Sequence, residues 1–249
     1  NNLKDWTIHA KAATLFGYTH DEVLKYFPGR IHELAEASGL TDDATFKKII
    51  EWYDGYRFHH SGGRVINPVS LGECFDRDEF NDYWSKTALP TFLIDILKVH
   101  PLDFSSLEID EEDLENYEPE HPKFVTLLYQ TGYLTIESFV QIGNSRRYTL
   151  RFPNLEIEHS FLKHVAGAYV GKDSSVSSGY AFEAAKALYA HDPQRFVKSL
   201  KSFFTDIPYD MTDRQNEQMW QTIVYVVLRS IGVNVNGEVK THDGRIDMV

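Results

Sequence analysis

The sequence contains a single cysteine, Cys74, and has neither a long apolar run nor an excess of positive charge. One cysteine excludes an intrachain disulfide and a zinc site built from cysteines. No apolar stretch approaches the roughly 18 residues that a membrane-spanning helix needs. The chain also does not start with a basic and then apolar signal sequence. We therefore expect a cytoplasmic protein that has no membrane partner.

The sequence also lacks the Gly-x-x-x-x-Gly-Lys-Ser/Thr motif that cradles nucleotide phosphates. Its first residue is Asn1 rather than methionine, and its last residues, Arg245 to Val249, have the pattern of a strand interior. We expect a fragment of a longer protein, so that missing motifs do not count against the parent protein.

The composition is that of a globular protein, and the net charge is unevenly distributed. The chain has 249 residues, of which 42% are hydrophobic and 25% charged, and its formal net charge is −12. At about 100–200 residues per domain, this length allows one large domain or two to three small ones. Uniform acidity would argue against nucleic acid as a partner. However, nine acids lie within residues 101–122, and removing them from −12 leaves −3. We expect residues 105–122 to be an acidic linker.

Helix signals dominate the first hundred residues, where Thr19 and Thr41 are predicted N-caps and Gly39 a helix stop. Residues 123–171 are predicted to form a helix, a β-hairpin and a second helix, an order compatible with a winged-helix-like module. The polar run Lys172–Gly179 predicts a boundary before residues 180–249.

The predicted hairpin of this module carries a group of basic residues. Arg146, Arg147 and Arg151 lie on it and are candidates for phosphate contacts, together with Arg245 near the C-terminus. The alternative is an ordinary exposed basic hairpin.

Three carboxylates near the C-terminus form a candidate metal site. Asp243-Gly244 favours a two-residue hairpin turn, which would place Lys240 opposite Asp247. Because side chains alternate along strands, Glu238 and Asp247 then share one face. The preceding helix adds Glu217, and carboxylates that converge at a sheet edge suit Mg²⁺ or Mn²⁺. The alternative is a Lys240–Asp247 ion pair and an exposed Glu217.

The run from Glu217 through Glu238-Val239 to Gly244-Arg245-Ile246-Asp247-Met248-Val249 resembles the start of a PD-(D/E)XK nuclease domain. In that superfamily a helix supplies a Glu, a strand supplies an Asp, and the next strand supplies Glu-x-Lys. The resemblance implies catalytic roles for Glu217 and Asp247, both as metal ligands, and Glu238 is similar to a recurring Glu of this subgroup. The Glu-x-Lys strand would follow Val249.

The upstream part is similar to the predicted AAA-ATPase-like proteins common in Bacteroidetes, which carry such a nuclease-like domain at their C-terminus. The motifs concerned are Asn1-Asn2-Leu3-Lys4-Asp5, Tyr18-Thr19, Trp52-Tyr53-Asp54-Gly55-Tyr56-Arg57-Phe58, Asn67-Pro68-Val69-Ser70-Leu71 and Tyr83-Trp84 with Pro90-Thr91-Phe92-Leu93. Ala88-Leu89-Pro90 departs from the usual Gly-Thr-Pro or Gly-Ser-Pro. The family's ATP-binding core would precede Asn1, so we expect Tyr53, Asp54 and Tyr56 to pack rather than to contact a nucleotide.

We therefore expect a mostly α-helical α+β chain. It would comprise a helical lid region of an ATPase (1–104), the linker, the winged-helix-like module (123–171) and the N-terminal half of a restriction-endonuclease-like α/β domain (180–249). The leading hypothesis is a fragment of an ATPase-coupled, metal-dependent nuclease-like protein that acts on DNA or RNA. Alone it should hydrolyse neither ATP nor nucleic acid. The alternative hypothesis is a non-catalytic regulatory module that binds a protein or nucleic-acid partner.

Overall fold

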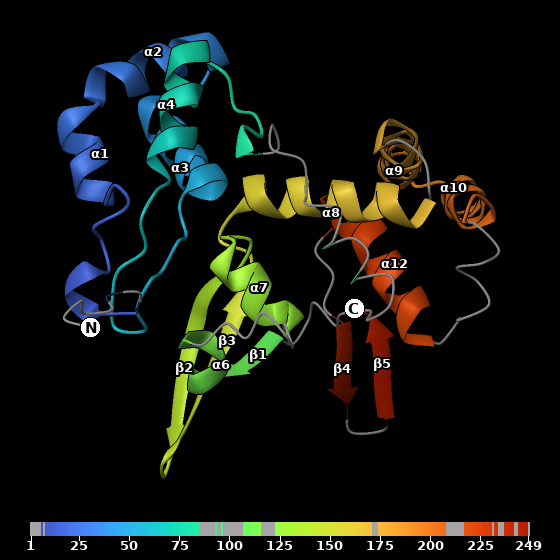
Figure 1. Ribbon diagram of the computed structural model, residues 1–249. Coiled ribbons are helices and arrows are strands. Elements are labelled where there is room, and N and C mark those ends of the chain that lie inside the picture. Colours follow the sequence, from blue (N-terminus) through green and yellow to red (C-terminus); the bar gives the residue numbers. More distant parts are fainter. Residues whose placement is uncertain are drawn as a thin grey trace. The chain divides into compact units, whose positions relative to one another are not determined.

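The chain is a mixed α+β protein and mostly helical, as predicted (Figure 1). The computed structural model describes residues 6, 8–84, 93, 96, 107–115, 123–170, 174–207, 217–230, 232–233, 237–241 and 244–248. Two compact units are present, Asn1–Lys86 with Ser106–Glu158 and Thr87–Ser105 with His159–Val249. The division falls within one helix, α8 (Leu155–Val170).

Short-range signals set the ends of the first helices. Thr19 and Glu22 form a capping box, in which the Glu22 N–H donates to Thr19 Oγ1 and the Thr19 N–H donates to Glu22 Oε2. Gly39 ends a helix with φ of 65°, and Thr41 Oγ1 accepts the first free N–H groups of the next one. The elements are η1 (Ala10–Ala12), α1 (His20–Tyr26), α2 (Pro28–Ser38), α3 (Asp42–Tyr53) and α4 (Pro68–Arg77).

The apolar faces of α1 to α4 enclose one core. Its largest member, Tyr53, is fully buried, and burying each large aliphatic side chain contributes about 1.5–3 kcal/mol relative to exposure. The core residues are Val23, Ile31, Leu34, Ile49, Tyr53, Ile66, Leu71, Cys74, Phe75 and Tyr83. Burial raises the pKa of the Cys74 thiol to about 11, so this cysteine is a packing residue.

The rest of the first unit is a small antiparallel sheet with short helices. The sheet order is β1-β3-β2, and a bulge interrupts the pairing of β2 with β3 between Ile136 and Ser138. Its elements are β1 (Leu107–Asp110), α6 (Glu111–Glu115), α7 (Phe124–Gln130), β2 (Thr135–Ile142) and β3 (Ser145–Arg151).

The acidic segment expected as a linker contains β1 and α6. Leu107 and Ile109 point into the core, whereas Glu108 and Asp110 are exposed on the alternate positions. Pairing with β3, 37 residues away at Asp110 and Arg147, turns this stretch into an edge strand. The acids therefore line a sheet and do not extend freely into solvent.

The second unit contains the remainder of α8, α9 (Ser174–Tyr189), α10 (Pro193–Thr205), α12 (Glu217–Ser230), β4 (Gly237–Thr241) and β5 (Gly244–Met248). Helix α9 begins at Ser174, within the stretch predicted as a polar linker, because Ser and Gly tolerate a helix that packs against a neighbour. That neighbour is α10, where the ring of Tyr180 meets Phe203 edge to face at 6.1 Å. No helix among the described residues is long and apolar enough to cross a bilayer.

The C-terminal hairpin differs from the predicted register. The structure pairs Thr241 with Gly244 and Lys240 with Arg245, so the predicted pairing of Lys240 with Asp247 is wrong by two residues. The cause is the position of the turn, which comprises residues 242 and 243 rather than Asp243 and Gly244. The predicted division into two faces is unaffected, because a shift of two residues keeps each position on its side of the strand.

Candidate functional site

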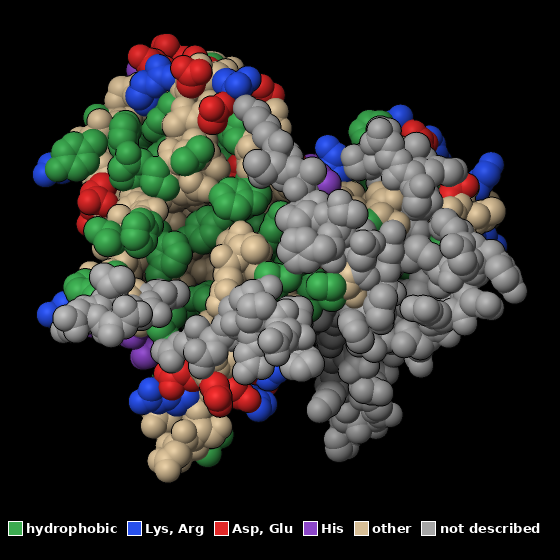
Figure 2. Space-filling model, in the orientation of Figure 1, with side chains coloured by type: hydrophobic (Ala, Val, Ile, Leu, Met, Phe, Trp, Pro, Cys, Tyr) green, Lys and Arg blue, Asp and Glu red, His purple; other side chains and the backbone are tan. Residues whose placement is uncertain are grey.

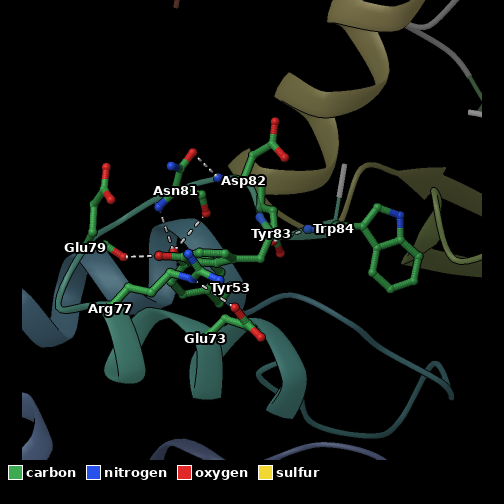
Figure 3. Close-up of polar contacts among 9 residues, drawn as sticks. Tyr53, Glu73, Arg77, Glu79, Asn81, Asp82, Tyr83 and Trp84 are labelled. Atoms are coloured by element: carbon green, nitrogen blue, oxygen red, sulfur yellow. Dashed lines mark hydrogen bonds and ion pairs between the residues drawn. The ribbon is translucent and has the colours of Figure 1, made fainter. Parts of the chain in front are cut away.

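The described residues of highest chemical interest form a buried joint within the first unit. It follows α3 and consists of Tyr53, Asp54, Gly55, Tyr56 and Arg57, which we call the joint segment. Tyr53 is fully buried, and its hydroxyl donates to the Asn81 carbonyl at 3.0 Å and accepts from the Asn81 N–H at 3.1 Å (Figure 3). Burial raises the pKa of this phenol, which keeps it protonated. As expected, Tyr53 packs the protein interior.

Asp54 and Gly55 occupy tight positions in the joint segment. The Asp54 carboxylate lies 3.1 Å from His20 Nε2 on α1, and only 6% of the Asp54 side chain is exposed. Gly55 has φ of 121°, and a Cβ at this position would lie 1.9 Å from the carbonyl oxygen of Pro153. Only glycine allows this approach of two backbone segments.

Tyr56 and Arg57 connect the joint segment to the sheet. The Tyr56 hydroxyl donates to the Gly132 carbonyl at 3.1 Å, and burial raises its pKa. The Arg57 N–H donates to Thr135 Oγ1 at 2.7 Å, and Arg57 Nη1 donates to the Glu137 carbonyl at 2.9 Å. The guanidinium therefore holds backbone carbonyls instead of facing a ligand.

Glu156 is a buried carboxylate that the sequence did not single out. Its side chain is fully buried at the start of α8, and Oε1 accepts from the N–H groups of Tyr83 at 2.8 Å and Trp84 at 2.9 Å. Burial raises its pKa, against the lowering effect of these hydrogen bonds. The only local signal is Asn154, which caps α8 and marks a helix start but not a buried acid.

Two of the predicted phosphate-binding arginines form ion pairs in the structure. Arg146 Nη1 lies 2.9 Å from Glu111 Oε1. Arg147 lies 3.3 Å from both Asp110 and Glu108, and these acids raise its pKa. Arg151 is partly buried, which lowers its pKa. A phosphate at Arg146 or Arg147 would compete with carboxylates that are already in place.

The candidate metal-site residues lie on adjacent elements of the second unit. Glu217 is the first residue of α12, and Glu238 and Asp247 lie on β4 and β5. The register places Glu238 opposite Asp247, between the pairs Gly237–Met248 and Val239–Ile246. Arg245 faces Lys240 one step away. The side chains of these positions lie outside the described residues.

Helix α12 contacts β5, so the three predicted acids lie on elements that are in contact. Among the residues whose side chains the structure describes, no three His, Cys, Asp or Glu side chains group as metal ligands. The geometry thus brings together the predicted positions Glu238 and Asp247, while it separates the hairpin arginines from free solvent charge.

Comparison with known proteins adds one relative. The chain is 32% identical over 258 residues to a protein of Azotobacter chroococcum mcd 1 named "Uncharacterized protein in vnfD 5'region". The match covers 100% of this chain and 47% of the relative, so the chain spans about half the length of the curated relative it matches. No protein-family model and no solved structure matches the chain.

Proposed function

We propose that the chain belongs to a cytoplasmic, ATPase-coupled nuclease-like protein of the AAA-ATPase-like and PD-(D/E)XK type, which cleaves DNA or RNA with Mg²⁺ or Mn²⁺. The observation that carries this proposal is the facing pair Glu238 and Asp247 on the C-terminal hairpin. Like charges directly opposite on a sheet are destabilising. A bound divalent cation would relieve that repulsion, and carboxylate oxygens are the donors that Mg²⁺ prefers.

The second facing pair supports a phosphate next to such a metal. Lys240 and Arg245 lie opposite one another, on the same face of the hairpin as Glu238 and Asp247. Two cations at facing positions are relieved by an anion just as two carboxylates are relieved by a cation. In this proposal Asp247, Glu238 and Glu217 hold the metal, and Lys240 with Arg245 orients the phosphodiester. The bound metal would supply Lewis-acid stabilisation of the phosphoryl oxygens.

ATP enters this proposal only through the parent protein. The 249 residues contain no phosphate-cradling Gly-Lys-Ser/Thr loop, so ATP would bind a core outside this sequence. The order β1, α6, α7, β2, β3, with β1 against β3, supports a winged-helix-like module between that core and the nuclease half.

The experiment that tests this function uses a longer chain that includes the strand after Val249. The expected result is cleavage of labelled DNA or RNA that requires Mg²⁺ or Mn²⁺ and is lost in Asp247→Ala. Absence of metal-dependent cleavage in the longer chain, or its persistence in Asp247→Ala, would show that the proposal is wrong.

A second candidate function is a non-catalytic regulatory module that binds a partner. The observation that favours it is the pairing of Arg146 and Arg147 with three acids, which leaves the winged-helix-like hairpin nearly neutral. A neutral hairpin suits a protein partner better than a phosphate backbone. The two functions differ in the strand after Val249, since Glu-x-Lys there favours an enzyme and its absence favours the regulatory module.

A further inference from the structure

Strand β2 forms one edge of the three-stranded sheet. The order β1-β3-β2 leaves the outer side of β2 without a neighbouring strand among the residues that the structure describes. An edge of this kind presents backbone N–H and C=O groups that another strand can pair with. Natural proteins usually protect such edges by charges, prolines or covering loops.

Only the inner half of the β2 edge has such protection. There Arg57 donates to Thr135 Oγ1 and to the Glu137 carbonyl, so the joint segment covers the strand as far as Glu137. The outer half, Ser138–Ile142, contains no charged residue and no proline. In Figure 1 this half of the hairpin extends beyond β1 and α7.

The outer half exposes apolar side chains. Val140 is 53% exposed and Ile142 is 77% exposed, and both lie on the same face of β2 because they are two residues apart. Their partners on β3 are Arg147 and Ser145. Two exposed β-branched residues on an uncharged edge are the features that favour strand addition.

The charge distribution selects the occupant of this edge. A chain with a net charge of −12 repels a second copy of itself over most of its surface. Around this hairpin, however, Arg146 is neutralised by Glu111, and Arg147 by Glu108 and Asp110. Figure 2 shows these acidic and basic side chains side by side at the base of the hairpin, above an uncharged tip. A second copy can therefore approach here without repulsion.

We propose that β2 pairs with β2 of a second copy of this chain, antiparallel and centred on Val140. Each Val140 then faces its counterpart, and each Ser138 faces Ile142 of the other copy. The two sheets join into one of six strands, in the order β1-β3-β2-β2-β3-β1. Since only five residues of each edge take part, the contact lies below the roughly 1,200 Å² of standard interfaces, and the dimer is weak and concentration-dependent.

Sedimentation of the full 249-residue chain over a concentration series tests this pairing. The wild type is expected to show a monomer–dimer equilibrium. In Val140→Lys with Ile142→Lys, the dissociation constant rises by about tenfold or more, because lysines then face one another across the two-fold axis.

The matched control places two lysines on another exposed apolar pair. Leu24 and Tyr26 on α1 are 49% and 64% exposed, and Leu24→Lys with Tyr26→Lys changes the net charge equally. This control is expected to dimerise as the wild type does. A wild type that stays monomeric at all concentrations would overturn the pairing. So would a Val140/Ile142 variant that dimerises as well as the wild type, or a control that loses the dimer equally.

Discussion

Gly55 and Pro153 approach each other so closely that residue 55 has no room for a side chain. A Cβ on Gly55 would lie 1.9 Å from the Pro153 carbonyl oxygen, and the φ of 121° at Gly55 disfavours any other residue. This contact joins the loop after α3 to the segment that leads into α8. It makes the first unit a single body in which the helices and the sheet share one joint.

Gly55→Ala should therefore destabilise the first unit strongly. We expect a loss of about 3 kcal/mol or more in the free energy of unfolding, because the clash is with backbone and the φ is unfavourable. Urea unfolding monitored by tryptophan fluorescence measures it. Gly72→Ala in α4 is the control, since nothing lies within 4 Å of a Cβ there. That control should gain about 0.5–1 kcal/mol, and equal effects in both variants would contradict the role of the joint.

Glu156 should have a separate energetic signature. Glu156→Ala leaves the buried N–H groups of Tyr83 and Trp84 without their acceptor, at a cost of about 2–4 kcal/mol. Glu156→Gln keeps an acceptor oxygen and should cost less. If both variants have the same unfolding free energy, Glu156 does not hold residues 83 and 84.

The pH dependence of stability tests the burial of the same carboxyl group. Because burial raises the pKa of Glu156 in the folded state above 4.5, its contribution to stability is greatest below the unfolded pKa. That contribution is lost as the pH rises through the folded pKa. The wild type should therefore lose more stability than Glu156→Gln as the pH rises above 4.5. Parallel curves for the two proteins would mean that the group titrates normally.

The ion pairs of Arg147 should limit nucleic-acid binding by the hairpin. Replacing both acids, Glu108→Gln with Asp110→Asn, frees one cation and should raise the affinity for duplex DNA. The slope of log affinity against log salt should steepen by about 0.9. Fluorescence anisotropy over a salt series measures both quantities. Glu36→Gln with Asp43→Asn changes the net charge equally on exposed helices, and an equal gain there would exclude a specific role of Arg147.

Local signals in the sequence sufficed for the helices of the first unit. Thr19, Gly39 and Thr41 act within one turn, so their effect does not depend on the rest of the fold. The acidic strand was not predictable in the same way. Glu108 and Asp110 meet Arg147 only after the chain has folded back, so an isolated reading saw nine acids and no partner.

The candidate site was predictable in part for the same reason. Alternation along strands correctly grouped Glu238 with Asp247, because the period of two does not depend on register. The turn preference of Asp243-Gly244 did not fix the register, which pairs Thr241 with Gly244. Glu156 had no signal, because burial of an acid depends on segments 72 and 73 residues away.

The most direct test of the central claim is a calorimetric titration of Mn²⁺ into a chain that includes the strand after Val249, compared with its Asp247→Asn variant. The account predicts saturable Mn²⁺ binding in the wild type and its loss in the variant, with the thermal unfolding of the metal-free proteins unchanged. Equal Mn²⁺ binding by both proteins, or no binding by the wild type, would contradict the metal site at Glu238 and Asp247.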